Sequence, residues 1–428
     1  MSEVKVVREK SLERGVEVLR EQIDAKISAF FTSCVHCGLC AEACLFYTET
    51  GNARYTPIHK LEPMRRQWQL EQGFWGKFGK ALGFYRELEE KDFADWEELL
   101  YDSCTMCGRC SMVCPVGNDI TFMIRRQREA FAAGGYTPEG LQDATERALE
   151  TGSPMGLTLH TLQAVLRRVQ EEYGVEVPVD KQGADYMALL SSMEIINFPE
   201  YIGSLAKIFE AAGVSWTLCS EAFEATNSGV QIGDSRAARE LVERVVRGAE
   251  GLGVKWVISP ECGLAYIAIR WDGPNLIGRP YGFEVVQVLE LLQQLLDEGR
   301  LRLQGTTDTR LTFHDPCQIV RRGGVVDAPR QLLSLVASDF HDTQAHGTMN
   351  WCCGGGGGVS ASERADDLRL QVFTRKKKQL ESVQPDLLVT ACANCRIILE
   401  DGLEHYGMQQ EVIGLTELVA EHLAPADS

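Results

Sequence analysis

Five cysteines in the last third of the chain have a spacing suited to holding a metal cluster: Cys317, Cys352, Cys353, Cys392 and Cys395. Adjacent cysteines bond poorly to each other, and the glycines from Gly354 to Gly358 let the backbone approach something bulky. We therefore expect two thiolates side by side in a glycine-rich pocket. His314 is a candidate proton donor beside them, although a histidine that caps a strand end is the commoner case.

Eight further cysteines form two runs with C-x2-C-x2-C-x3-C spacing: Cys34, Cys37, Cys40 and Cys44, then Cys104, Cys107, Cys110 and Cys114. Three thiolates from one tight loop and one from a following helix can surround a 4Fe–4S cubane. Because the fourth cysteine in such pairs serves the other cluster, we assign Cys114 to the first cubane and Cys44 to the second. Pro115 follows the second run as the pattern expects, whereas Leu45 follows the first.

Zinc and a dinucleotide both fit these motifs less well than iron–sulfur clusters do. Zinc would suit two C-x2-C pairs, but it explains neither the x3-C spacings nor five cysteines near one C-terminal site. A dinucleotide fingerprint fails at Val359, which occupies the position of its third glycine. For the two remaining cysteines, Cys219 and Cys262, we expect buried small side chains, or a place for one of them on a substrate channel.

Composition favours a reducing compartment and argues against several partners. Fifteen cysteines in 428 residues are unlike the disulfide frameworks of small secreted chains, and the charged N-terminus lacks the apolar region of a signal peptide. With a net charge of −18, nucleic acid is not an expected partner, because binding it needs a basic face. Without an apolar stretch long enough to span a bilayer, attachment to a membrane would need another subunit. We expect the basic run from Arg375 to Lys378 to be a solvated helix face.

The elements that position these residues differ between the two ends of the chain. Residues 3–30 have the apolar stripe of one packing helix, and residues 57–100 are helical in pattern and rich in aromatic side chains, which we interpret as core and cover for the clusters. A helical connector follows at 134–182. We expect it to break at Ser153-Pro154 and to resume as a helix over 157–173.

Beyond residue 183, short apolar runs alternate with helical patterns, which indicates an α/β domain. The predicted strands are 187–196, 215–218, 255–258, 310–313, 387–390 and 411–414. The predicted helices include 235–251, 284–298 and 363–384. The segment 257–265 resembles 387–395, with Ala265 in the place of a thiolate. The segment 216–220 likewise resembles 351–353, with Ser220 in the place of another thiolate. We interpret residues 183–310 as a degenerate copy of residues 311–428.

The two cubane runs and the five-cysteine signature together resemble the heterodisulfide-reductase-type iron–sulfur proteins. In these relatives the signature is C-xn-CC-xn-C-x2-C, and the second spacer is slightly long here. The resemblance covers the chain from Cys34 to Cys395. It implies an all-α, ferredoxin-like dicluster module at 1–133, fused through the connector to an α/β domain of two repeated CCG-type halves.

The resemblance also implies a function. In the family, the five cysteines bind a non-cubane 4Fe–4S cluster that reduces or forms a disulfide. With a single intact signature, the chain is most similar to the DsrK, HmeD and HdrD type of subunit. This similarity implies a haem-b, quinone-interacting membrane subunit (DsrM-like) and a small DsrC-like disulfide or trisulfide protein as partners in dissimilatory sulfur metabolism. It further implies a cytoplasmic protein attached to the inner membrane through its partner subunits.

Two alternatives remain open. The chain is also similar to the iron–sulfur subunits of anaerobic glycerol-3-phosphate or glycolate dehydrogenases, which relay electrons from a flavin subunit to quinone without disulfide chemistry. Those subunits usually carry two CCG signatures, and this chain keeps one. A lipoate-linked sulfur-oxidation subunit would share the disulfide chemistry but lack the membrane partner.

Overall fold

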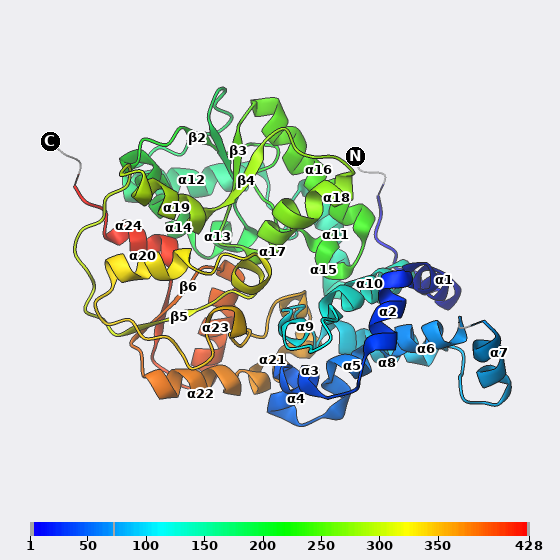
Figure 1. Cartoon of the computed structure of the whole chain (residues 1–428). Helices are drawn as coiled ribbons and strands as arrows, with labels where there is room; N and C mark the ends of the chain where they lie inside the picture. The colour runs from blue at the N-terminus through cyan, green and yellow to red at the C-terminus, as the bar shows by residue number, and fades with distance from the viewer. Residues whose placement is uncertain (1–3, 72, 426–428) are drawn as a thin grey trace.

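The computed structural model describes residues 4–71 and 73–425, and its N-terminal part is helical. The helices there are α1 (Leu12–Gln22), α2 (Ala25–Ser33), α3 (Leu39–Glu42), α4 (Leu45–Thr50), α5 (Pro57–Lys60), α6 (Glu62–Leu70), α7 (Phe74–Ala81), α8 (Glu90–Tyr101), α9 (Arg109–Met112) and α10 (Ile120–Ala133). Figure 1 shows this part at the lower right, with α7 at its far end. Buried Leu19, Phe93 and Phe131 belong to its core, in which the two phenylalanine rings stack 4.4 Å apart.

The single helix predicted over residues 3–30 is wrong, because the chain forms two helices there. Ile23 leaves the helical backbone at φ −85° and ψ 82°, which ends α1. The Asp24 carboxylate then accepts a hydrogen bond from the Ile27 backbone N–H at 2.8 Å and starts α2. The apolar stripe still packs inward, since Leu19 and Ile27 are fully buried.

The interpretation of the aromatic segment 57–100 as core and cover is only partly correct. Phe93 and Trp96 are buried. By contrast, Phe74, Phe78 and Phe84 are 72%, 47% and 76% exposed. The pattern of aromatic residues alone could not separate these two sets, because the exposed set lies on a projecting segment.

The connector contains α11 (Glu139–Thr151) and α12 (Leu159–Tyr173), which confirms the predicted break at Ser153-Pro154. Gly152 has a left-handed backbone, with φ 90°, and so ends α11. The Thr158 hydroxyl accepts a hydrogen bond from the Thr161 N–H and caps α12.

The C-terminal part is an α/β domain with two parallel sheets in the described residues. The first sheet has the order β2 (Trp216–Thr217), β1 (Tyr186–Ala188), β3 (Trp256–Ser259) and β4 (Glu284–Gln287). The second has the order β5 (Leu311–His314), β6 (Leu387–Thr390) and β7 (Glu411–Gly414), with Leu311 opposite Leu387 and Leu387 opposite Glu411. The strands predicted at 387–390 and 411–414 are confirmed at their full length.

Helices surround both sheets in Figure 1. They are α13 (Ser192–Ile196), α14 (Pro199–Ala211), α15 (Ser228–Ile232), α16 (Ser235–Leu252), α17 (Gly263–Tyr266), α18 (Gly273–Ile277), α19 (Val288–Asp297), α20 (Ala328–Val336), α21 (Asp366–Val372), α22 (Thr374–Val383), α23 (Ala393–His405) and α24 (Leu415–Glu421). The whole chain is therefore a mixed α and α/β protein.

Two predicted elements change type along their length. The strand predicted over 187–196 ends at Ala188, because Ser191 and Glu194 form a capping box that starts α13. The helix predicted over 284–298 begins only at Val288, because residues 284–287 pair with β3 as strand β4. Val285 and Val286 are buried and β-branched, which suits a strand.

The two halves of the α/β domain share one hydrophobic core, which includes Ile258 from the first sheet and Phe313 from the second. A buried glutamate after β3 also joins them. The Glu261 carboxylate accepts hydrogen bonds from the backbone N–H and the hydroxyl of Thr416, at 2.8 and 2.6 Å. The Glu261 backbone carbonyl accepts a hydrogen bond from the Ala393 N–H at 2.8 Å, directly beside Cys392.

A buried carboxyl in the first half gives a testable pH dependence of stability. Burial raises the pKa of Glu224 from 4.5 to about 7, and one of its oxygens accepts the Thr226 N–H at 2.6 Å. Because the pKa of Glu224 is higher in the folded than in the unfolded chain, the protonated carboxyl stabilises the fold at pH values below the unfolded pKa. This stabilisation is lost as the pH rises through 7. We expect Glu224→Gln to gain stability relative to the natural chain, by up to about 3 kcal/mol, as pH rises from 5 to 8.

Denaturant unfolding at several pH values measures this difference. The exposed neighbour Glu221→Gln serves as the matched control and should follow the natural chain at every pH. A Glu224→Gln variant whose stability ran parallel to that of the natural chain would contradict the assignment of this pKa.

Candidate functional site

The two cysteine runs near the N-terminus form two separate groups of four thiols. One group lines a cavity of about 210 Å³ and consists of Cys34, Cys37, Cys40 and Cys114. The other lines a cavity of about 40 Å³ and consists of Cys44, Cys104, Cys107 and Cys110. Each group thus contains the fourth cysteine of the other run, and all fifteen cysteines of the chain are free thiols.

The two loops that carry these thiols have matching backbones. His36 and Met106, each just before the second cysteine of its run, have φ values of 52° and 51°. Gly38 and Gly108 follow at 82° and 81° and start α3 and α9. A left-handed residue other than glycine is uncommon, and its repetition here turns both loops around their thiols in the same way.

The five cysteines of the C-terminal signature meet at the carboxyl ends of β5 and β6. Cys317 follows β5 at the start of a π-helical turn, and Cys392 caps α23 directly after β6, with Cys395 in its first turn. All five are buried, and the sulfurs of Cys317 and Cys352 lie 3.9 Å apart. Parallel strands that end at one edge bring residues distant in sequence to one site.

The glycine run lets its own backbone pack closely against neighbouring segments, and it also lines a cavity. A Cβ at Gly355 would lie 2.3 Å from an Ile398 side-chain carbon, and one at Gly357 would lie 2.7 Å from the Thr105 backbone carbon. Gly356 and Gly357 also line the large cavity described below. The run therefore presses the CC loop against both α23 and the second cubane loop.

The second cubane loop contacts the CC pair directly. The Cys352 sulfur donates to the Thr105 hydroxyl at 3.4 Å, and the Cys352 side chain is the main cause that raises the pKa of Cys107. The second group of thiols and the C-terminal site are thus adjacent.

Arginines and one tryptophan hold this contact in place. Arg321 donates hydrogen bonds to the backbone carbonyls of Cys107 at 3.0 Å and Thr348 at 2.6 Å, and also to that of Asn350. Trp351 lies between two guanidinium groups, since the Cζ atoms of Arg109 and Arg375 lie 3.6 and 4.6 Å from its ring centroid. These contacts join the second cubane loop to the loop that carries Cys352 and Cys353.

Neighbouring thiols favour the thiolate form at three positions. Hydrogen bonds with Cys107 and Cys317 lower the pKa of Cys352, and hydrogen bonds with Cys352 and Cys395 hold the pKa of Cys353 well below its usual range. The hydrogen bond with Cys395 lowers the pKa of Cys392 to about 7. The same hydrogen bonds raise the pKa values of Cys317 and Cys395 well above their usual range, so the five thiols share their protons. Five converging sulfurs still fit a metal cluster, because a metal binds cysteines as thiolates.

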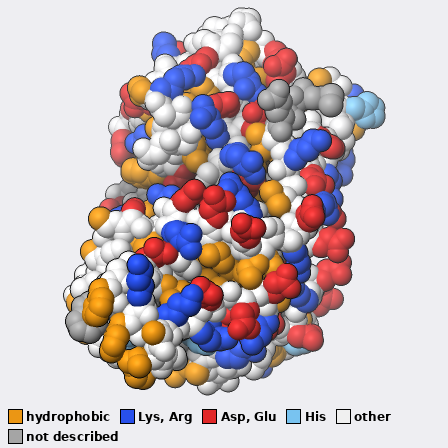
Figure 2. All heavy atoms as spheres, turned by 90° about the vertical axis from the view of Figure 1, so that its right-hand side faces the viewer, with side chains coloured by type: hydrophobic (Ala, Val, Ile, Leu, Met, Phe, Trp, Pro, Cys, Tyr) orange, Lys and Arg blue, Asp and Glu red, His pale blue; other side chains and the backbone are white. Residues whose placement is uncertain are grey.

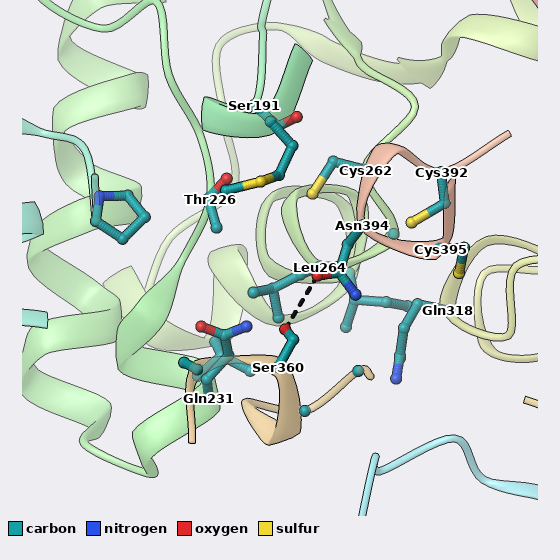
Figure 3. A pocket seen from close by; sticks show the side chains of 18 of the residues that line it. Ser191, Thr226, Gln231, Cys262, Leu264, Gln318, Ser360, Cys392, Asn394 and Cys395 are labelled. Atoms are coloured by element: carbon teal, nitrogen blue, oxygen red, sulfur yellow. Dashed lines mark hydrogen bonds between the residues drawn. The ribbon is translucent and has the colours of Figure 1, made fainter. Parts of the chain in front are cut away.

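A cavity of about 410 Å³ opens at this site, and four of the five cysteines line it: Cys317, Cys353, Cys392 and Cys395. Cys262 of the first half also lines it, and Figure 3 shows its side chain across the cavity from Ser360. Cys219 is buried against Gly248 and is not part of the wall. Both predicted burials are confirmed, and Cys262 is the one of the two that faces a channel.

His314 lies beside the same thiols. Its nearest ring nitrogen and the sulfurs of Cys353 and Cys395 lie within 4.8 Å of one another, and neither ring nitrogen has a hydrogen-bond partner among the described residues. Burial, followed by the charge of Lys376, holds the pKa of His314 well below its usual range, so the ring is neutral at pH 7. A neutral imidazole carries one N–H that can donate a hydrogen bond, and the ring delivers a proton only after it has taken one up.

The basic run between Cys353 and Cys392 is only partly the solvated face that was predicted. Lys376 is buried, its pKa falls to about 8 because of that burial, and it donates to the Gln379 side chain at 2.7 Å. Arg375 stacks on Trp351. The prediction was wrong for these two residues. The run lies beside buried acceptors and thiols, and the spacing of residues in the sequence does not reveal these neighbours.

Sequence reasoning also missed two buried cations around the second group of thiols. Lys60 donates to the Ser103 carbonyl and lies 3.9 Å from the Cys44 sulfur. Arg128 donates to four backbone carbonyls, those of Leu100, Cys104, Gln231 and Gly357. Their acceptors are backbone groups from distant segments, so no motif signals them.

Two family models match this chain. A 4Fe–4S dicluster domain covers residues 31–118, and a cysteine-rich domain of the CCG type covers residues 311–400. These matches coincide with the two groups of thiols and with the C-terminal site. They support bound 4Fe–4S clusters.

Curated relatives extend the similarity to nearly the whole chain. The Hdr-like menaquinol oxidoreductase iron–sulfur subunit 2 of Archaeoglobus fulgidus is 25% identical over 95% of this chain and 82% of its own. A subunit of the dihydromethanophenazine:CoB–CoM heterodisulfide reductase of Methanosarcina mazei is 27% identical over 91% and 93%. The EtfAB:quinone oxidoreductase of Syntrophomonas wolfei is 25% identical over 87% of this chain and 55% of its own. Together these matches support an Hdr-like, electron-transferring iron–sulfur oxidoreductase subunit.

The comparison with solved structures gives only a weak match. The glutamate racemase isoform RacE1 of Bacillus anthracis matches with a TM-score of 0.28 and 12% identity, over 56% of this chain and 80% of its own, which carries no argument about function. Across residues 4–71 and 73–425, no helix is both long and apolar enough to cross a membrane.

Arg321 and its neighbour Arg322 offer a matched test of the contact between the two sites. Arg321→Met removes the donor of three hydrogen bonds and leaves buried carbonyls unpaired, so we expect a loss of about 3 kcal/mol in the free energy of unfolding. Arg322→Met removes one hydrogen bond of 3.4 Å and should cost about 1 kcal/mol or less. Denaturant unfolding measures both variants, and equal losses would contradict the role of Arg321.

Proposed function

We propose that this chain is a DsrK-like catalytic subunit of a membrane-associated electron-transfer complex, a heterodisulfide-type oxidoreductase. Its proposed task is to reduce or form the disulfide or trisulfide of a small DsrC-like protein in dissimilatory sulfur metabolism. The observation that carries the proposal is the contact between the second cubane loop and the CC loop, where the Cys352 sulfur bonds to the Thr105 hydroxyl at 3.4 Å, because this contact connects the dicluster module to a thiol-lined cavity.

The proposed ligand sets follow the groups of thiols. Two 4Fe–4S cubanes are held by Cys34, Cys37, Cys40 and Cys114, and by Cys44, Cys104, Cys107 and Cys110. A non-cubane 4Fe–4S cluster is held by Cys317, Cys352, Cys353, Cys392 and Cys395. The free thiols, the cavities that the two N-terminal groups line and the convergence of the five buried signature cysteines support these sets.

Reduction of a disulfide takes two electrons and two protons and releases two thiols, and bound 4Fe–4S clusters supply electrons one at a time. The cavity admits a substrate sulfur to the signature cysteines, and apolar side chains such as Met106, Met193 and Leu264 exclude water from it. His314 is the proposed catalytic proton donor, because its ring lies beside the sulfurs of Cys353 and Cys395; it donates from its imidazolium form, which its lowered pKa makes strongly acidic. The same residues serve disulfide formation when the electrons run the other way.

The first half of the α/β domain is proposed to be a degenerate copy of the second. In both halves a cysteine follows a parallel strand and caps a helix: Cys262 after β3, and Cys392 after β6. With Ala265 in place of a second thiol, the first half lacks a complete ligand set. It instead supplies a wall of the cavity through Cys262, Gly263 and Leu264.

The proposed partners are a haem-b, quinone-interacting membrane subunit of the DsrM type and the DsrC-like substrate protein. The proposed location is the cytoplasmic face of the inner membrane, with attachment through partner subunits. Relatives whose names include menaquinol and dihydromethanophenazine oxidoreduction support a membrane electron carrier as one reaction partner.

A second candidate is an electron relay between a flavoprotein and quinone, with no disulfide chemistry of its own. The similarity to an EtfAB:quinone oxidoreductase favours it. The large cavity at the signature cysteines favours the catalytic proposal instead, because a relay needs no space for a substrate beside its last cluster.

Substitutions at the CC pair separate these candidates. We expect Cys352→Ser and Cys353→Ser to abolish disulfide turnover while both cubanes remain, so that iron falls from about twelve to about eight atoms per chain. We expect His314→Asn to keep the full iron content and to slow turnover, because it removes only the proton donor. Iron analysis and turnover of a disulfide substrate test all three variants, and full turnover in either serine variant would sink the catalytic proposal.

A further inference from the structure

An exposed aromatic segment projects from the helical end of the molecule. It comprises residues 73–86, that is, α7 and the turn after it. Its exposed apolar side chains are Phe74, Phe78, Leu82 and Phe84, which are 72%, 47%, 55% and 76% exposed. Figure 1 places α7 at the far right end, and Figure 2, which faces this end, shows hydrophobic side chains gathered along its lower edge.

Close packing within the segment fixes its conformation. Gly76 lets α7 approach the end of α6, since a Cβ there would lie 2.4 Å from the Leu70 carbonyl oxygen. Gly79 lets the Tyr85 ring fold back onto α7, where a Cβ would lie 2.4 Å from that ring. The Phe84 N–H donates to the Gly79 carbonyl at 2.9 Å. The chain therefore holds the exposed phenylalanines in a defined arrangement, with Phe74 and Phe78 stacked on one face.

The charge of the segment is opposite to that of the whole chain. Residues 73–86 contain Lys77, Lys80 and Arg86 and no acidic residue, whereas the chain carries a net charge of −18. Lys80 pairs with Glu87, and Arg86 pairs with Asp92 at 2.8 Å. Lys77 is exposed and forms no ion pair within the described part of the chain. A basic, aromatic segment on an acidic protein is complementary to an anionic surface.

We propose that residues 73–86 bind the surface of a lipid bilayer that contains anionic headgroups. The phenylalanines and Leu82 enter the boundary between headgroups and acyl chains, and the lysines stay at the level of the phosphates. This binding is direct, so it differs from attachment through a partner subunit and does not depend on disulfide chemistry. It would hold the end of the molecule that carries the first cysteine run close to the membrane.

Vesicle flotation of the full-length, cluster-loaded protein tests the proposal under anaerobic conditions. We expect the protein to float with vesicles of phosphatidylcholine and phosphatidylglycerol, and less with phosphatidylcholine alone or at high salt. We expect the double variant Phe74→Ser and Phe84→Ser to bind at least about tenfold more weakly. Lys77→Glu should weaken binding to the anionic vesicles only.

Matched controls change exposed residues elsewhere. The double variant Trp271→Ser and Leu335→Ser removes apolar side chains that are 49% and 46% exposed, and Lys181→Glu reverses an exposed lysine of the α/β domain. Both should bind as the natural chain does, and iron content reports that all variants are folded. Absence of vesicle binding by the natural chain, or equal binding by the phenylalanine variant, would overturn the proposal. Loss of a copurifying integral membrane protein with unchanged vesicle binding would also overturn it and assign the segment to a protein partner.

Discussion

The contact between the second cubane loop and the loop that carries Cys352 is the constraint on which the arrangement of this protein depends. It joins a loop of the dicluster module to a loop more than two hundred residues later, and both loops are buried where they meet. Guanidinium groups stabilise the contact from several sides, because Arg321 bonds to both loops and Arg109 stacks on Trp351. Arg128 adds a third tie, between Cys104 and Gly357. Buried cations are tolerated here because backbone carbonyls accept their hydrogen bonds.

That constraint explains why the second half of the α/β domain needs the first. The signature cysteines form one side of the cavity, and residues after β1 and β3 close the other. Glu261 bonds to Thr416 and to the backbone N–H beside Cys392, so the first half also positions a signature cysteine. The first half thus serves the site as a wall and a support.

Local spacing predicted the cysteine groups well, because C-x2-C-x2-C loops turn around their thiols through short-range geometry at His36 and Gly38. Strands of apolar residues such as 387–390 were predictable for the same local reason. The roles of Arg321, Arg128 and Lys376 were not, since their partners are backbone groups and thiols far away in sequence. Strand β4 was missed because its apolar residues run directly into the stripe of α19, and only pairing with β3 separates the two elements.

The central claim is that the five signature cysteines hold a cluster that meets a substrate sulfur. Anaerobic electron paramagnetic resonance of the oxidised protein, with an iron and sulfide count, tests it before and after addition of the candidate thiol protein. The account predicts a paramagnetic signal in the oxidised state that shifts when the thiol is added. A protein that stays silent until it is reduced, and whose spectrum ignores the thiol, would contradict it.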